Sequence, residues 1–113
     1  MNQVQVTGRL VKDPQVRELP DGRTVCTVRL AVEGMGRENT VGYVEATDFG
    51  PSARAAGETL SKGWLVACAG RLDYREWQTD TGERRSAVGL VGRIEFLAAP
   101  RGARSVRREE VAA

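Results

Sequence analysis

Residues 49–72, FGPSARAAGETLSKGWLVACAGRL, place a short helix directly before a strand, and this order decides the fold. Pro51 suits the first turn of a helix, where its missing N–H leaves no hydrogen bond unmade. Apolar positions then recur at helical spacing, at Ala53, Ala56 and Leu60. The sequence therefore predicts a helix over 51–61, with Gly63 as its stop and an alternating strand after it.

Five segments alternate apolar and polar residues at period two, the pattern of half-buried strands. They are residues 2–12, 23–33, 41–49, 64–77 and 84–97. The apolar face of the last two is expected to comprise Val66, Cys68, Leu72, Val88, Leu90, Ile94 and Phe96. Asp13-Pro14 ends the first strand because proline cannot donate to a ladder, and only a short extended piece is expected before the turn at 19–22.

Five strands with one short helix leave too little helix to cover a doubly wound sheet, so the strands must close or form a sandwich. A five-stranded barrel with a helix between strands three and four is the oligonucleotide/oligosaccharide-binding (OB) arrangement. The sequence therefore predicts an all-β OB-fold domain over residues 1–98. Residues 99–113 contain four arginines and two glutamates and are predicted to form a basic, disordered tail.

Composition excludes several classes of protein. The formal net charge is +2, and residues 1–98 hold equal numbers of basic and acidic side chains, so charge alone does not indicate a nucleic-acid binder. With no histidine, no phosphate-binding loop and no metal-ligand spacing, we expect neither catalysis nor a cofactor. Cys26 and Cys68 are expected to be buried core residues, with a disulfide or subunit cross-link as the alternative. No signal peptide or membrane span is evident, so we expect a cytoplasmic, nucleoid-associated protein.

The outward faces of two strands carry aromatic rings beside guanidinium groups. Tyr43 and Phe49 share one face of the third strand, and Arg71, Arg75 and Trp77 share the non-core face of the fourth. Unpaired bases stack on aromatic rings while arginines hold the phosphates, so the pattern favours single-stranded nucleic acid. Each feature has a packing alternative: a hairpin contact for Trp77, a subunit contact for Tyr43, a barrel cap for Phe49, and solvated ion pairs for the arginines.

Three stretches carry a family resemblance: NQVQVTGRLVKDPQVRELPDGRTVCTVRLAV from residue 2, YVEATDFGPSARAAGETLSKGWLVACAGRL from residue 43, and YREWQTDTGERR from residue 74. Over about residues 2–97 the chain resembles bacterial single-stranded DNA-binding proteins. The resemblance implies sequence-tolerant binding of single-stranded DNA during replication, recombination and repair, and a homotetramer, with a dimer as the alternative. It places Tyr43, Phe49 and Trp77 at stacking positions and Lys62 at a basic one. The full set of expected DNA contacts is Tyr43, Phe49, Trp77, Arg71, Arg75, Lys62, Arg9, Arg29, Arg84 and Arg85.

Several departures from the family pattern predict weaker binding or a smaller footprint. The loop EGMGREN at 33–39 lacks the ring often found there, and Glu45 stands where a cation is common. Asp48 occupies a usually apolar position, and a carboxylate facing the barrel would need a partner. The chain also ends without the family's long linker and acidic tip. We therefore expect poor recruitment of tail-dependent partners, as in a short paralogue, a phage or plasmid version, or a truncated form.

An interaction module is the alternative function, in the form of a replication-restart scaffold similar to primosomal replication protein N. Trp77 and Phe49 favour the DNA-binding function, whereas the missing loop ring and acidic tip favour the scaffold. A third possibility is a barrel that has lost DNA binding and only pairs with another subunit. For assembly, edge strands one and four are expected to pair between subunits.

Overall fold

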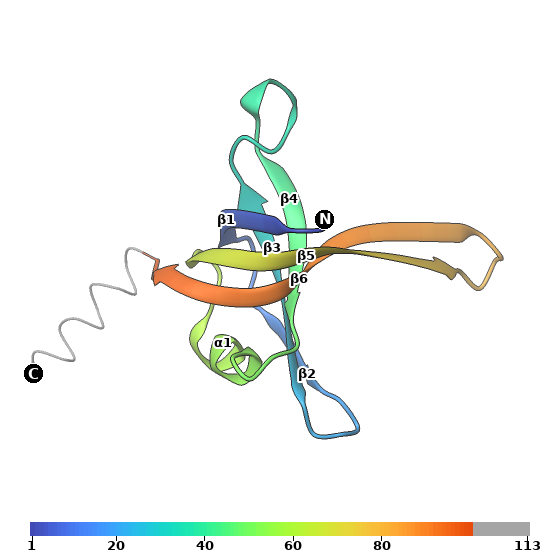
Figure 1. The fold of residues 1–113 in the computed structure, drawn as a ribbon, viewed down its shortest axis with the longest axis horizontal. Helices are drawn as coiled ribbons and strands as arrows, with labels where there is room; N and C mark the ends of the chain where they lie inside the picture. Colours follow the sequence, from blue (N-terminus) through green and yellow to red (C-terminus); the bar gives the residue numbers. More distant parts are fainter. Residues whose placement is uncertain (101–113) are drawn as a thin grey trace, which may run out of the picture.

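A computed structural model describes residues 1–100 of the protein and shows a closed sheet with one helix beside it and a long projecting ribbon (Figure 1). The elements are β1 (Val4–Leu10), β2 (Gln15–Glu18), β3 (Thr24–Val32), a 3-10 turn (Arg37–Asn39), β4 (Gly42–Asp48), α1 (Ala53–Thr59), β5 (Leu65–Gln78) and β6 (Arg84–Ala98). The predicted all-β OB architecture is confirmed, with the helix before β5. Within the described part of the chain, no helix is long and apolar enough to cross a membrane. The predicted tail beyond residue 100 lies outside the described residues.

The sheet closes because β1 pairs with two strands. The hydrogen-bonded order is β1-β5-β6-β4-β3-β2, and β1 also pairs with β3 at Leu10↔Leu30, which makes a ring of five strands. The strand outside this ring, β2, is the short extended piece after Asp13-Pro14. It pairs antiparallel with β3 from Gln15↔Thr27 to Glu18↔Thr24. The proline break thus divides one long strand in two, and both parts pair with β3.

The free edges of the sheet include parts of two strands. β5 pairs with β6 along its whole length on one side but with β1 only as far as Gly70 on the other, so, in the described part of the chain, that second side has no strand partner over residues 71–78. The register between β1 and β3 covers only Arg9 and Leu10, so the side of β1 that faces away from β5 has no strand partner over residues 4–8. Both strands expected to pair between subunits, β1 and β5, therefore have part of one edge free in the single chain.

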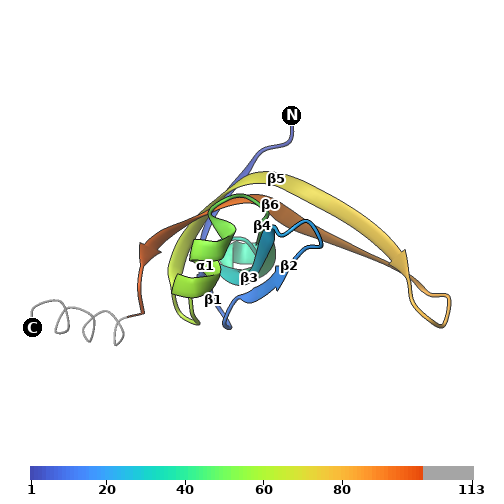
Figure 2. The same cartoon turned by 90° about the horizontal axis from the view of Figure 1, so that it is seen from below.

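The core lies between the ring of strands and α1 (Figure 2). The helix is shorter than the predicted 51–61, but its predicted apolar face is confirmed, since Ala53, Ala56 and Leu60 are all buried. Trp64, at the entry to β5, is only 7% exposed, and its ring meets Phe96 edge-on at 6.0 Å between centroids. Trp64 has the parity of Val66 and Cys68 in the predicted strand, but it was not among the core residues predicted from the sequence.

The far halves of β5 and β6 form a two-stranded ribbon that projects well beyond the barrel (Figures 1 and 2). Leu72 and Val88, predicted to face the core, are 47% and 58% exposed. The prediction was wrong because their side of the ribbon has no barrel interior behind it. Where the ribbon leaves the barrel, Gly70 lies opposite Gly92, and a Cβ on either would collide with the backbone of the other strand.

One carboxylate and two thiols are buried in the core. Asp48 is 2% exposed and accepts hydrogen bonds from the N–H of Gly50 (2.7 Å), the hydroxyl of Ser52 (2.6 Å) and the N–H of Ile94 (3.3 Å). Cys26 and Cys68 are buried and free, as predicted. Burial, and then the nearby charge of Asp48, raises the pKa of both thiols to about 11.

Candidate nucleic-acid interface

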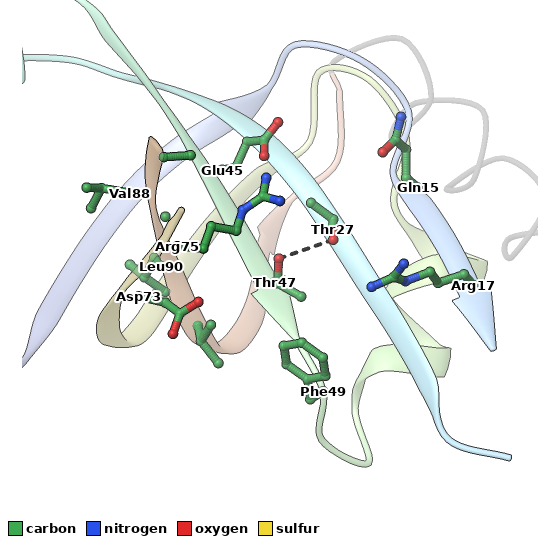
Figure 3. A pocket seen from close by; sticks show the side chains of 13 residues that line it. Gln15, Arg17, Thr27, Glu45, Thr47, Phe49, Asp73, Arg75, Val88 and Leu90 are labelled. Atoms are coloured by element: carbon green, nitrogen blue, oxygen red, sulfur yellow. Dashed lines mark hydrogen bonds between the residues drawn. The ribbon is translucent and has the colours of Figure 1, made fainter. Parts of the chain in front are cut away.

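An open hollow of about 330 Å³ lies on the outer surface of the sheet, at the base of the ribbon (Figure 3). Five strands supply its lining, which mixes one ring, two cations, two carboxylates and several neutral polar groups. The lining residues are Gln15, Arg17, Thr27, Glu45, Thr47, Phe49, Asp73, Arg75, Ala87, Val88, Gly89, Leu90 and Val91. Within the lining, the hydroxyls of Thr27 and Thr47 form a hydrogen bond of 3.1 Å. The hollow therefore presents a flat aromatic ring next to hydrogen-bonding side chains of positive and negative charge.

Phe49 lies at one end of this hollow because β4 ends there. Gly50 and Pro51 follow it and turn the chain into α1, which leaves the ring on the surface of the sheet. The same ring also lines a neighbouring hollow with Arg23 and Arg54. Phe49 is thus an exposed aromatic platform shared by two adjoining depressions.

The ribbon face that continues from the hollow carries the second platform. Arg71, Arg75 and Trp77 alternate along one face of β5, and Arg85 of β6 pairs directly opposite Trp77. The guanidinium of Arg75 lies 4.8 Å from the centroid of the Trp77 ring, which is 42% exposed. Arg71 is held by Asp73 at 3.3 Å. This arrangement leaves a large ring open to solvent with a cation beside it.

Tyr43, on β4, forms a second aromatic–cation pair. It shares a face of the strand with Glu45, Thr47 and Phe49, and its ring is exposed. The guanidinium of Arg29, on the neighbouring β3, lies 5.4 Å from the ring centroid. The predicted residues Tyr43 and Arg29 therefore lie together.

Three of the predicted cations lie apart from this group. Arg84 alternates with Arg85 and so lies on the opposite face of the ribbon, where it pairs with Glu76 at 3.7 Å. Arg9 donates from its guanidinium to the carbonyl of Gly63 at 3.1 Å, next to Lys62. The loop between α1 and β5 that holds Lys62 is at the end of the molecule away from the ribbon tip (Figure 1). Any DNA that touches all ten predicted residues must therefore wrap around the barrel.

Gln15 and Arg17 line the hollow but were not predicted. Both belong to β2, which the sequence showed only as a short extended piece. Their alternation was visible, yet their place beside the hollow depends on the pairing of Gln15 with Thr27, 12 residues along the chain. The signal that would have found them is the register of this four-residue strand.

Comparisons with known proteins point to one family. The model of the single-strand binding protein family matches residues 1–97. The chain is 35% identical over 99 residues to the single-stranded DNA-binding protein of Thermotoga maritima, covering 82% of this chain and 70% of that protein. It is 30% identical over 103 residues to single-stranded DNA-binding protein 1 of Clostridium acetobutylicum, covering 86% and 94%.

Other relatives are longer than this chain. The single-stranded DNA-binding protein of Neisseria meningitidis serogroup B is 34% identical over 97 residues, which span 80% of this chain and 56% of that protein. Among solved structures, the Plasmodium falciparum SSB complex with ssDNA has the same fold, with a TM-score of 0.77 at 21% identity over 87% of this chain and 96% of that one. The family match over nearly the whole described region, together with curated relatives of 30–35% identity, shows that this chain belongs to the single-strand binding protein family.

Proposed function

We propose that this protein binds single-stranded DNA with little dependence on sequence and protects exposed strands during replication, recombination and repair. The observation that carries the proposal is the open ring of Trp77 beside Arg75, on a ribbon face continuous with the hollow that Phe49 lines. Stacking of a base on an aromatic ring contributes roughly 1–3 kcal/mol and is possible for every base. The proposed activity is binding without a catalytic step, in the cytoplasm at the nucleoid.

The predicted contacts divide into two roles in this proposal. Tyr43, Phe49 and Trp77 stack bases, and the cations beside them hold phosphates. Arg75 and Arg29 already lie over rings, so a base stacked nearby keeps its phosphate close to a guanidinium. Arg71 and Arg85 are paired with Asp73 and Glu83, and a phosphate must compete with these carboxylates.

A titration with dT oligonucleotides, followed by tryptophan fluorescence at low and high salt, tests the proposal. We expect strong quenching, because Trp77 is exposed, and an affinity that falls with salt. Trp77→Ala should weaken binding about tenfold or more. Gln78→Ala is the matched control, since it changes the next, uncharged residue on the opposite face of the same strand and should bind like the parent. A folded protein that neither binds nor responds to the oligonucleotide would contradict the proposal.

We further propose that the chain assembles as a homotetramer, with a dimer as the alternative. Two features support assembly: the unpaired edge of β1 over residues 4–8, and an apolar strip on the ribbon formed by Leu72, Tyr74 and Val88, all exposed in the single chain. Sedimentation equilibrium should give a mass of several chains. Tyr74→Asp should lower that mass, and an unchanged mass would remove the strip from the interface.

A scaffold resembling primosomal replication protein N is the second candidate function. The same apolar strip favours it, because an exposed apolar surface also fits a different protein partner. The titration separates the two functions: a folded protein that binds no oligonucleotide supports the scaffold, and salt-dependent binding lost with Trp77→Ala supports the DNA binder.

A further inference from the structure

Glu45 is an exposed carboxylate that lines the hollow, on the β4 face that also carries Phe49. Arg29 lies directly across from it on β3, yet the guanidinium of Arg29 lies over the Tyr43 ring instead. Within residues 1–100, the side chain of Glu45 forms no ion pair within 4.0 Å and accepts no hydrogen bond. Its oxygens therefore remain available to a ligand in the hollow.

The neighbours of Glu45 differ in their hydrogen-bonding capacity. Asp73, the other carboxylate of the lining, is bound to Arg71 at 3.3 Å. The Glu45 carboxylate and the Arg75 guanidinium are both directed into the hollow, and Phe49 lies in the same lining (Figure 3). A base held beside Glu45 would thus meet an acceptor pair from Glu45 and a donor from Arg75, while Phe49, at the end of the hollow, offers its ring to a neighbouring base.

The four bases match this arrangement differently at their Watson–Crick edges. Guanine offers two adjacent donors, N1–H and N2–H, which fit the two oxygens of a carboxylate, and its O6 accepts from a guanidinium. Thymine has a single N–H between two carbonyl oxygens, and both oxygens repel a carboxylate. Cytosine and adenine each offer one amino donor beside a ring acceptor. Guanine alone supplies both donors and the acceptor that this set requires.

We propose that Glu45 is a specificity-determining residue that gives the interface a preference for guanine over thymine. The inference rests on the proposed single-stranded DNA binding and refines it. Stacking still accepts any base, and the carboxylate makes the affinity depend on which base is bound. A carboxylate near the phosphates lowers overall affinity for DNA by charge repulsion. The carboxylate therefore favours guanine-containing strands at the expense of affinity for all others.

Fluorescence anisotropy with labelled dT oligonucleotides, in which every third base is replaced, tests the proposal at fixed salt. The replacements are dG, dA, dC and deoxyinosine, and isolated guanines between thymines do not form four-stranded structures. We expect the dG strand to bind about tenfold more tightly than all-dT. Deoxyinosine keeps N1–H but lacks the N2 amino group, so its strand should fall between the two.

Glu45→Gln keeps the shape of the side chain and removes one of its two acceptors. It should reduce the dG preference to below about twofold while tightening the binding of all-dT. Glu58→Gln is the charge-matched control: Glu58 is exposed on α1, outside the hollow, and its variant should keep the parent's base preference.

Two results overturn the inference while leaving DNA binding in place. One is equal affinity of the parent for the dG and dT strands, and the other is a dG preference that survives Glu45→Gln. If the folded parent binds none of the oligonucleotides, the proposed function fails as well. The base profile and the presence of binding are read from the same titrations, so the two failures are distinguishable.

Discussion

At the scale of single residues, Asp48 shows how a buried charge is accommodated. The sequence raised the question of its partner, and the structure answers it with donors from the next turn, the start of α1 and β6. Three donors on one carboxylate replace the water lost on burial. Asp48 thereby ties the end of β4 to two other elements just where the chain must leave Phe49 exposed.

Asp48→Ala should destabilise the fold by about 2–3 kcal/mol, because it leaves buried N–H groups without an acceptor. Urea denaturation measures the loss as a lower midpoint at unchanged slope. Ser52→Ala removes one donor and leaves the carboxylate its two N–H partners, so it should cost about 1 kcal/mol or less. Equal midpoints for Asp48→Ala and the parent would show that these hydrogen bonds do not stabilise the fold.

The two thiols predict how stability depends on pH. Cys26 and Cys68 have a folded pKa of about 11 against an ordinary 9.0. Between these values the unfolded chain loses protons that the folded chain keeps, so stability is intact below pH 9 and falls as pH rises toward 11. The loss should be about 1 kcal/mol per thiol between pH 8 and pH 10. In urea denaturation under reducing conditions, the double Cys→Ala variant should show a smaller fall, and an equal fall would contradict the assignment.

At the scale of elements, the alternation of each strand predicted on which face a side chain lies, but it did not predict whether that side chain is buried. Val28 and Leu30 are buried and Trp77 is exposed, as period two requires. Leu72 and Val88 follow the same pattern yet are exposed, because alternation fixes the face of a strand and says nothing of where the barrel ends. The candidate site shows the same limit. The exposure of Tyr43, Phe49 and Trp77 could be predicted from the alternation within their own strands. The place of Gln15 and Arg17 depends on the register between β2 and β3, which alternation does not give.

The glycine pair at the base of the ribbon predicts a sensitive position on β6. A Cβ at Gly92 would collide with the carbonyl oxygen of Ala69, so Gly92→Ala must shift one strand and should cost about 1–3 kcal/mol. Gly89→Ala, on the same strand, meets only the carbonyl oxygen of Glu45 at 3.3 Å and should cost less. Thermal denaturation of both variants makes the comparison, and a smaller loss for Gly92→Ala than for Gly89→Ala would contradict it.

At the scale of the whole molecule, the balance of charge sets the expected salt dependence. Six arginines are paired with carboxylates within 4.0 Å in the described part of the chain: Arg23, Arg54, Arg71, Arg84, Arg85 and Arg93. The lining of the hollow itself contains two cations and two carboxylates. DNA binding then exchanges many internal ion pairs for phosphate contacts, which limits the net release of counterions.

The slope of log affinity against log salt should therefore be shallow, and specific residues should change it differently. Arg75→Ala should reduce the slope by about one unit, because one phosphate contact is lost. Trp77→Phe should lower affinity and leave the slope unchanged, since it alters stacking alone. Titrations from low to moderate salt provide the measurement, and equal slopes for Arg75→Ala and the parent would show that Arg75 makes no phosphate contact.

The projecting ribbon has two faces, one with Arg75 and Trp77 and the other with Leu72, Tyr74 and Val88. It is a single pair of strands that no other described element flanks at its tip (Figures 1 and 2). Restricting the motion of the ribbon costs entropy, and a molecule bound on one face reduces the entropy cost of binding on the other face. A molecule docked on the apolar face would therefore strengthen binding on the aromatic face without any change of shape. Subunit assembly on one face and DNA binding on the other would then be thermodynamically linked through the projecting ribbon.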